Sequence, residues 1–205
     1  GVQADDVSRT SQTIPGVKFR VPAEHYVVLK RGDVQAIIVD NEAIDIPALP
    51  GHRAGYNGVA SLTPTNRSEN LFVPSIAGLN FEHIHDGTKQ GLVDKFEPRK
   101  FPTQLRIIDD STVEVYQPPT GNWMLESCGR YQLLDDGTIE YTFECIPRAK
   151  AYRHDYIGLF WASYIHAPAE RAIFFKGRNA GTDSAARWIR GVTPKHGTDS
   201  THRPA

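Results

Sequence analysis

The segment Asn80-Phe-Glu-His-Ile-His-Asp-Gly87 holds the densest group of reactive side chains in the chain. Side chains alternate between the two faces of a β-strand, so we expect His83 and His85 to project together and Glu82 and Ile84 to project the other way. Two imidazoles on one face can bind a metal ion, transfer protons or hydrogen-bond a polar ligand. This segment is therefore the first candidate for a functional site.

Acid/base chemistry on a saccharide is the leading interpretation of the site. Saccharide sites combine aromatic rings for stacking with carboxylate, Arg, Asn and His side chains that bind hydroxyl groups. Residues 156–166 add aromatic and imidazole groups on one candidate strand. The candidate catalytic residues are His83, His85, His166 and Glu82. The candidate substrate-binding residues are Arg67, Arg99, Trp123, Tyr164 and Asn80.

A metal ion is the alternative interpretation of the two histidines. His83-Ile-His85 has the two-ligand spacing of a strand-borne site, and imidazole suits Zn, Fe, Mn or Ni. A cupin-like barrel places a glutamate a few residues later, where this chain has Lys89 and Gln90. The alternative hypothesis is thus a cupin-like enzyme with a divalent metal at His83 and His85, whereas the leading hypothesis needs no cofactor.

Composition and motifs argue against several other classes of function. The 205 residues include 23 basic and 24 acidic side chains, for a formal net charge of −1, so no global field favours nucleic acid. No apolar run approaches the roughly 20 residues that span a bilayer, so no membrane partner is expected. The chain has no Gly-x-Ser-x-Gly nucleophile elbow and no phosphate-binding loop.

The two cysteines flank a predicted hairpin over residues 131–144. A two-residue Asp136-Gly137 loop would place Cys128 directly opposite Cys145, where a cross-strand disulfide can form in an oxidising compartment. A three-residue Asp135–Gly137 loop with a bulge would shift this register. In that case the cysteines are free thiols that pack as small hydrophobic side chains.

Short strand candidates separated by Pro, Gly and Asp turns predict an all-β fold, an antiparallel β-sandwich with few short helices. Many of the candidates alternate apolar and polar residues, as Thr112-Val-Glu-Val-Tyr116 does. Besides the segment at Asn80, strands are expected at Val17–Val21, Tyr26–Lys30, Val34–Asp40, Leu71–Val73, Leu105–Ile108, Thr112–Tyr116, Trp123–Leu134, Thr138–Ile146, Tyr156–Ile165 and Ala172–Lys176.

The remaining segments are expected to be loops, one short helix and a flexible N-terminus. Residues 1–14 are polar and predicted to be flexible, and residues 15–205 form a single domain. Two long functional loops are expected at Ile46–Asn70 and Gly177–Ala205. Within the second, Ser184–Arg190 is the best helix candidate.

The two ends of the chain carry weaker indications. Val2-Gln3-Ala4 has the small-residue pattern that ends a signal peptide. It is either the remnant of an exported precursor, which predicts a periplasmic or secreted protein, or an artificial start. Residues 199–205 do not return to a strand, which indicates a frayed tail or a domain cut before its natural end.

Three segments resemble, in this order, the galactose mutarotase-like (aldose 1-epimerase) superfamily of β-supersandwich carbohydrate proteins. The segment Asn80–Gly87 looks like the family segment with the first catalytic histidine. Tyr131-Gln-Leu-Leu-Asp-Asp-Gly-Thr-Ile-Glu140 is similar to the family's Asp-Asp-Gly hairpin, and Gly158–His166 to its strand with a second histidine. The resemblance covers roughly residues 75–170.

This resemblance implies a supersandwich whose concave sheet holds a saccharide. The expected activity is acid/base chemistry on that sugar, by epimerisation, elimination or hydrolysis. A non-catalytic carbohydrate-binding domain is the remaining alternative, because aromatic and Arg side chains bind sugars without matched pKa values.

Overall fold

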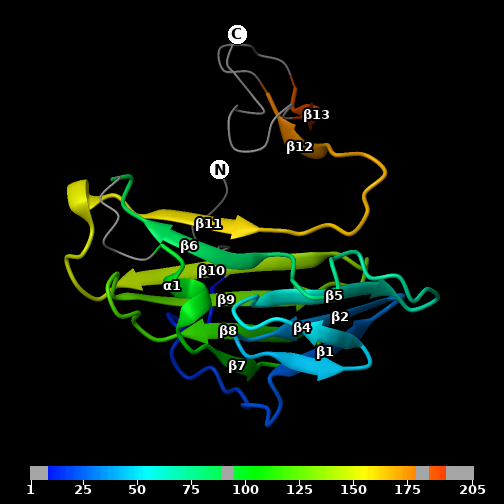
Figure 1. Cartoon of the computed structure of the whole chain (residues 1–205), viewed down its shortest axis with the longest axis horizontal. Coiled ribbons are helices and arrows are strands. Elements are labelled where there is room, and N and C mark those ends of the chain that lie inside the picture. The colour runs from blue at the N-terminus through cyan, green and yellow to red at the C-terminus, as the bar shows by residue number, and fades with distance from the viewer. Residues whose placement is uncertain (1–8, 89–94, 179–184, 193–205) are drawn as a thin grey trace. The chain divides into compact units, whose positions relative to one another are not determined.

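The structure is a computed structural model that describes residues 9–88, 95–178 and 185–192 (Figure 1). Across these residues the fold is all-β with antiparallel sheets, as the sequence predicted. No helix in the described part of the chain is long and apolar enough to cross a membrane.

The strands are β1 (Tyr26–Arg31), β2 (Val34–Val39), β3 (Ile44–Ile46), β4 (Leu49–His52), β5 (Gly58–Pro64), β6 (Asn80–His85), β7 (Gln104–Ile107), β8 (Thr112–Gln117), β9 (Leu125–Leu133), β10 (Ile139–Pro147), β11 (Gly158–Ala162), β12 (Ile173–Gly177) and β13 (Arg187–Gly191). The helical elements are α1 (Glu97–Lys100) and the 3-10 turn η1 (Arg153–Asp155).

The chain forms two compact units, residues 1–166 and residues 167–205. In the second unit β12 and β13 pair as an antiparallel ladder in which Ile173 lies opposite Gly191. The first unit contains all the other elements. The single domain expected over residues 15–205 stays a prediction.

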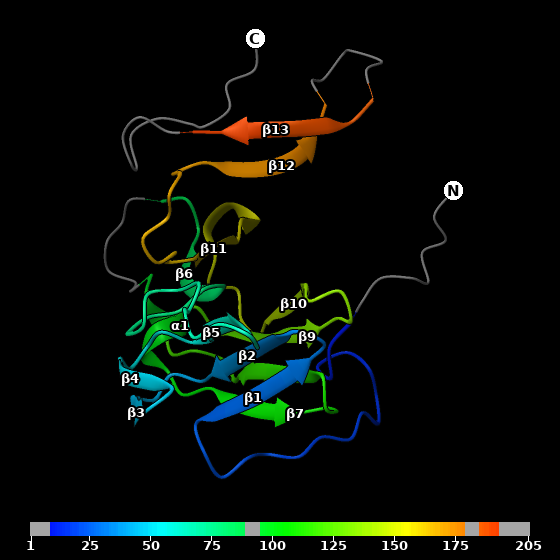
Figure 2. The same cartoon turned by 90° about the vertical axis from the view of Figure 1, so that its right-hand side faces the viewer.

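The first unit is built on a four-stranded sheet with the order β10-β9-β8-β7, packed against the three-stranded sheet β1-β2-β5. Figure 2 shows the blue strands β1 and β2 beside the green strands of the larger sheet. The residues between the two sheets are mostly aliphatic, and burial of each large one contributes about 1.5–3 kcal/mol. The buried members of this core are Val27, Leu29, Ala36, Ile38, Val59, Phe72, Leu105, Val113, Val115, Tyr131 and Leu133.

The two-stranded sheet β6-β11 packs on the other end of the same inner face of the large sheet. Phe81 and Ile84 of β6 lie in one core cluster with Trp123 and Leu125. Trp161 of β11 packs against this cluster, stacked on Phe81 with ring centroids 5.1 Å apart. The sheet that carries the predicted site residues is thus anchored by its apolar face.

The β9–β10 hairpin has the three-residue loop, not the two-residue one. Leu133 lies opposite Ile139, and Gly137 takes the left-handed conformation (φ 79°) that ends such a loop. Cys128 is therefore opposite Glu144, and Cys145 projects from the other face. Both cysteines are free, so the disulfide alternative is wrong.

Three other sequence predictions need correction. The expected loop Ile46–Asn70 contains β4 and β5, because Gly58-Val-Ala-Ser-Leu-Thr-Pro64 pairs with β2 despite its flanking Gly and Pro residues. The described part of the expected helix Ser184–Arg190 is largely strand β13, because pairing with β12 satisfies its backbone, and Ser184 lies outside the described residues. Strand β13 also interrupts the expected loop Gly177–Ala205, of which residues 179–184 and 193–205 lie outside the described residues. The segments at Val17–Val21 and Leu71–Val73 contribute isolated bridges at Arg20 and Phe72.

The outer face of the large sheet is covered by residues 9–14. Thr10 is fully buried, and its hydroxyl donates to Glu144 Oε2 at 2.6 Å. The Ser11 amide donates to Glu114 Oε1 at 2.9 Å, and Arg130 pairs with the same carboxylate at 2.8 Å. This part of the segment predicted to be flexible therefore makes specific contacts, and residues 1–8 lie outside the described residues.

Candidate functional site

A β-bulge in β6 places the acid and a histidine on the same side. Phe160 pairs with His83 and the next residue, Trp161, pairs with Phe81, so Glu82 is the extra residue of β6. His83 and His85 project from one face, as predicted: the His83 ring stacks on Phe160, and the His85 ring lies against the β11 backbone. The bulge turns Glu82 toward His83 rather than away from it.

The Glu82 carboxylate joins three polar side chains. Its Oε1 accepts hydrogen bonds from Arg99 Nη1 at 2.9 Å and from the Tyr164 hydroxyl at 3.0 Å. Its Oε2 lies 3.8 Å from His83 Nε2. We call these four residues the Glu82 cluster. All four were predicted as site residues, and the fold brings them together from three separate segments.

Arg99 is positioned by α1, a single turn with Pro98 at its start and basic residues at its end, both of which suit a helix. Buried side chains hold this turn: Asn41 Nδ2 donates to Pro98 O at 2.7 Å, and Glu97 accepts the amide of Trp123 at 3.1 Å. Arg99 Nε donates to Gly55 O at 2.9 Å. A Cβ atom on Gly55 would lie 2.8 Å from Arg99 O, so this close approach requires glycine.

Aromatic rings surround the cluster. The Arg99 guanidinium carbon lies 3.9 Å from the ring centroid of Tyr56, which packs edge-on against Tyr164 at 5.8 Å. The His83 ring is stacked on Phe160 at 5.0 Å and packs edge-on against Phe96 at 4.5 Å. An open pocket of about 290 Å³ lies beside the cluster, lined by Ala54, Gly55, Phe96, Arg99 and Lys100.

The environment separates the pKa values of the two proton-carrying groups. Burial, aided by the nearby charges of Lys95 and Arg99, lowers the pKa of His83 below 6.5 despite Glu82. Burial and the hydrogen bond to Glu82 raise the pKa of Tyr164 to about 12. At neutral pH His83 is therefore a neutral base and Tyr164 a protonated acid.

Other predicted residues lie outside the cluster. His85 is two residues beyond His83 on the same face, and its Nδ1 accepts the Gly87 amide at 3.2 Å. His166 is exposed beyond the end of β11 and bonds Leu71 O through its backbone amide. Arg67 is exposed in the turn after β5, where its backbone amide bonds Pro64 O. The structure does not bring His166 or Arg67 to the Glu82 cluster.

Two further predicted binding residues have structural positions. Asn80 is fully buried, and its Nδ2 donates to Asn57 O at 3.0 Å, which ties β6 to the loop before β5. Trp123 is buried in the core with its ring stacked on Tyr152 at 5.1 Å. Neither side chain faces the pocket, since both are enclosed by protein.

The metal alternative finds no complete ligand set in the described residues. No group of three or more His, Cys, Asp or Glu side chains there could hold a metal ion. His83 and His85 lie on one face, but Gly87 donates to one ring nitrogen of His85. The side chain of His154 and the whole of His196, two other histidines of the chain, lie outside the described residues.

The aromatic rings around the cluster were only partly predicted from the sequence. Tyr56 lies in the segment Ile46–Asn70, which was expected to be a functional loop, and Phe160 lies among residues 156–166, which were expected to supply aromatic groups. Phe96 carried no signal, because a single aromatic residue beside Glu97-Pro98 is as typical of core packing as of a ligand site. Only the contact with His83 identifies its role.

Comparison of the chain with family models, curated proteins and solved structures finds no match. The resemblance to the galactose mutarotase-like superfamily therefore stays a prediction.

Proposed function

We propose that this protein is carbohydrate-active and performs acid/base chemistry on a saccharide at the Glu82 cluster. One observation carries the proposal: a single buried carboxylate contacts Arg99 at 2.9 Å, Tyr164 at 3.0 Å and His83 at 3.8 Å beside an open pocket. Such a convergence of titratable groups, in which the pKa values of His83 and Tyr164 are shifted, is typical of a catalytic site.

Each member of the cluster has a distinct proposed role. His83, neutral at pH 7, accepts a proton from the substrate. The Tyr164 hydroxyl turns from Glu82 Oε1 to a substrate oxygen, donates its single proton there and recovers a proton from solvent. Glu82 holds both groups in place through its two oxygens. Arg99 balances the charge of Glu82 and, as part of the pocket wall, contacts the ligand.

The arrangement favours epimerisation or elimination over hydrolysis. Both favoured reactions need one group that removes a proton and another that supplies one, which matches His83 and Tyr164. Hydrolysis of a glycosidic bond usually requires two carboxyl groups on either side of it. Among the described residues of the cluster, Glu82 is the one carboxylate.

The wider parts of the proposal follow the sequence resemblance. A β-supersandwich of the galactose mutarotase-like type, in the periplasm or secreted, suits a protein that acts on saccharides. Non-catalytic binding is the second candidate, favoured by the Phe160 ring, which is 45% exposed over His83 and offers a stacking face.

Paired substitutions test the catalytic proposal. On a polysaccharide panel, followed by ultraviolet absorbance of unsaturated products and by NMR of anomeric signals, His83→Gln and Tyr164→Phe should each lower turnover by about 100-fold or more. The matched control His166→Gln should leave turnover unchanged, because His166 lies outside the cluster. Unchanged turnover in both cluster variants would refute the assignment.

Two further measurements separate the alternatives. Binding to the panel with no product from the wild-type protein would favour the non-catalytic domain. Elemental analysis of active protein decides the metal hypothesis, because an active sample without metal excludes it. His85→Ala then shows whether the second histidine takes part, since turnover should fall if it also transfers a proton.

A further inference from the structure

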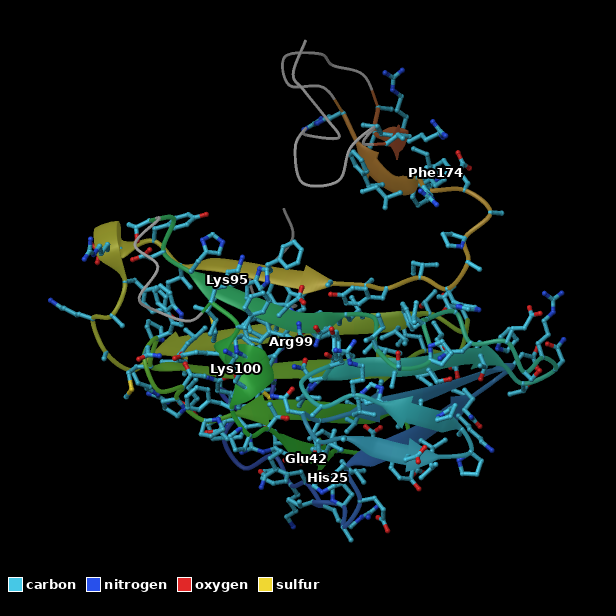
Figure 3. All side chains as sticks on the ribbon, in the orientation of Figure 1. His25, Glu42, Lys95, Arg99, Lys100 and Phe174 are labelled. Atoms are coloured by element: carbon cyan, nitrogen blue, oxygen red, sulfur yellow. The ribbon has the colours of Figure 1, made fainter. Side chains whose placement is uncertain are left out.

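The pocket beside the Glu82 cluster is surrounded by basic side chains. Arg99 and Lys100 line it directly, both from α1. Lys95 precedes the helix, and Arg53 lies in the loop that supplies Ala54 and Gly55 to the pocket wall. Figure 3 shows Lys95, Arg99 and Lys100 gathered around α1.

Three of these cations, Arg53, Lys95 and Arg99, are held at the site by aromatic rings. Lys95 Nζ lies 5.1 Å from the ring centroid of Phe96, a residue of the pocket wall. The guanidinium carbon of Arg53 lies 5.3 Å from the ring centroid of Tyr56, whose ring also carries Arg99. Cation–π contacts of this kind fix long side chains that would otherwise extend into water.

Among the described residues, the two acidic side chains next to the pocket, Glu82 and Glu97, are directed into the protein. Glu82 is bound to Arg99, and Glu97 is fully buried, where it accepts the backbone amides of Asn122 and Trp123. Arg53, Lys95 and Lys100 are exposed. The positive charge around the pocket also acts on His83. Burial is the main cause of the lowered pKa of His83, and the charges of Lys95 and Arg99 lower it further.

We infer that the saccharide recognised at this pocket is anionic and bears a carboxylate or sulfate group that binds Arg53, Lys95 and Lys100. This inference rests on the proposed function and specifies its substrate class. A neutral sugar needs ring stacking, for which Phe96 and Phe160 offer their rings, and hydrogen bonds to its hydroxyl groups, which do not require several exposed cations. The surrounding cations give a negatively charged sugar both added affinity and orientation.

The test compares each polysaccharide with its own neutral derivative. Calorimetry would use chondroitin sulfate, its desulfated form and its desulfated, carboxyl-reduced form, together with polygalacturonate, alginate and their methyl esters. At least one charged member should bind about tenfold more tightly than its neutral derivative, and this preference should decline between about 50 and about 500 mM NaCl. Loss of affinity on desulfation identifies sulfate as the bound group, and loss on carboxyl reduction or esterification identifies carboxylate.

Lysine variants connect the preference to the pocket. Lys95→Gln and Lys100→Gln should each weaken binding of the charged member by about threefold to tenfold, with little effect on the neutral derivative. Lys30→Gln, on the exposed side of β1, is the matched control and should change nothing. Unchanged affinity in both pocket variants would overturn the inference.

The outcomes distinguish this inference from the proposed function. If neutral members bind as tightly as charged ones and their turnover depends on His83 and Tyr164, only the anionic preference fails. If no charged member binds but a neutral one is turned over, again only the anionic preference fails. If no member is bound or turned over, both proposals fail together.

Discussion

Replacing Arg99 by leucine is expected to destabilise the first unit by about 3–4 kcal/mol. The change removes the cation that pairs with Glu82, whose side chain is only 8% exposed. It also removes the hydrogen bond to Gly55 O at 2.9 Å and the contact with the Tyr56 ring at 3.9 Å. The buried carboxylate would keep the Tyr164 hydroxyl but lose its charged partner.

The magnitude follows from these contacts. Removing one partner of a buried ion pair costs about 3–5 kcal/mol. The Arg99 side chain is 20% exposed, so solvent reaches the pair and the lower end of that range applies. A hydrogen bond and a cation–π contact are each worth about 1 kcal/mol. These contributions overlap at one side chain, so they are not added in full.

Urea unfolding followed by tryptophan fluorescence measures the loss, since Trp123 and Trp161 pack in the core of the first unit. A double-mutant cycle with Glu82→Gln should give a coupling of about 2 kcal/mol, because glutamine leaves no buried charge without a partner. Arg67→Leu is the matched control, exposed in a turn, and should stay within about 0.5 kcal/mol of the wild type. A loss below about 1 kcal/mol for Arg99→Leu would refute the reasoning.

Three further predictions concern the rest of the first unit. A hydrogen bond from His25 Nδ1 to Asp40 Oδ2 at 2.8 Å raises the pKa of His25 above 6.5. The contribution of this pair to folding stability is therefore fully present below pH 6.5 and is lost as the pH rises through the pKa of His25 in the folded protein. Urea unfolding between about pH 5 and about pH 9 should show this loss of stability, and His25→Asn should remove the pH dependence. Gly58→Ala should lower the free energy of unfolding by about 2 kcal/mol or more, as measured by thermal unfolding, because φ is +107° and the new Cβ would lie 2.7 Å from Gly78 O. A smaller loss would contradict the close approach of Gly58 to Gly78, because it would mean that the two segments move apart easily. Burial raises the pKa of the Cys128 thiol to about 12. In a Cys145→Ser variant, which removes the half-buried second thiol, a thiol reagent at about pH 8 should therefore label Cys128 only after unfolding, and rapid labelling of that folded variant would contradict its buried position.

The strands that the sequence predicted well are those whose signal is local. Thr112-Val-Glu-Val-Tyr116 alternates and forms β8 almost as expected, and the Asp-Gly turn marks the β9–β10 hairpin. The errors arise where distant pairing decides. Gly58–Pro64 is flanked by loop-forming residues but becomes β5 through pairing with β2, and Ser184–Arg190 is too short for a stable helix without tertiary support.

The candidate site was predictable in its residue types and not in its geometry. The sequence indicated Glu82, His83, Arg99 and Tyr164 as reactive or binding groups, but nothing in the order of residues joins Arg99 to Tyr164. That contact depends on α1, which buried side chains such as Asn41 hold in place. The same limit explains why Trp123, an attractive stacking residue in the sequence, is a core residue in the structure.

The bulge at Glu82 is the reason that regular strand alternation predicts the wrong face for Glu82, although it predicts the shared face of His83 and His85 correctly. Regular alternation would place Glu82 with Ile84 and apart from His83. Because Glu82 is the extra residue, Phe81 and Ile84 share the core face although they are three positions apart. The acid is thereby turned to the face of His83, where it meets Arg99 and Tyr164. A site that needs a histidine base and the carboxylate that positions it from consecutive residues of one strand requires such an irregularity. The bulge is therefore the structural feature that makes the proposed chemistry available to β6.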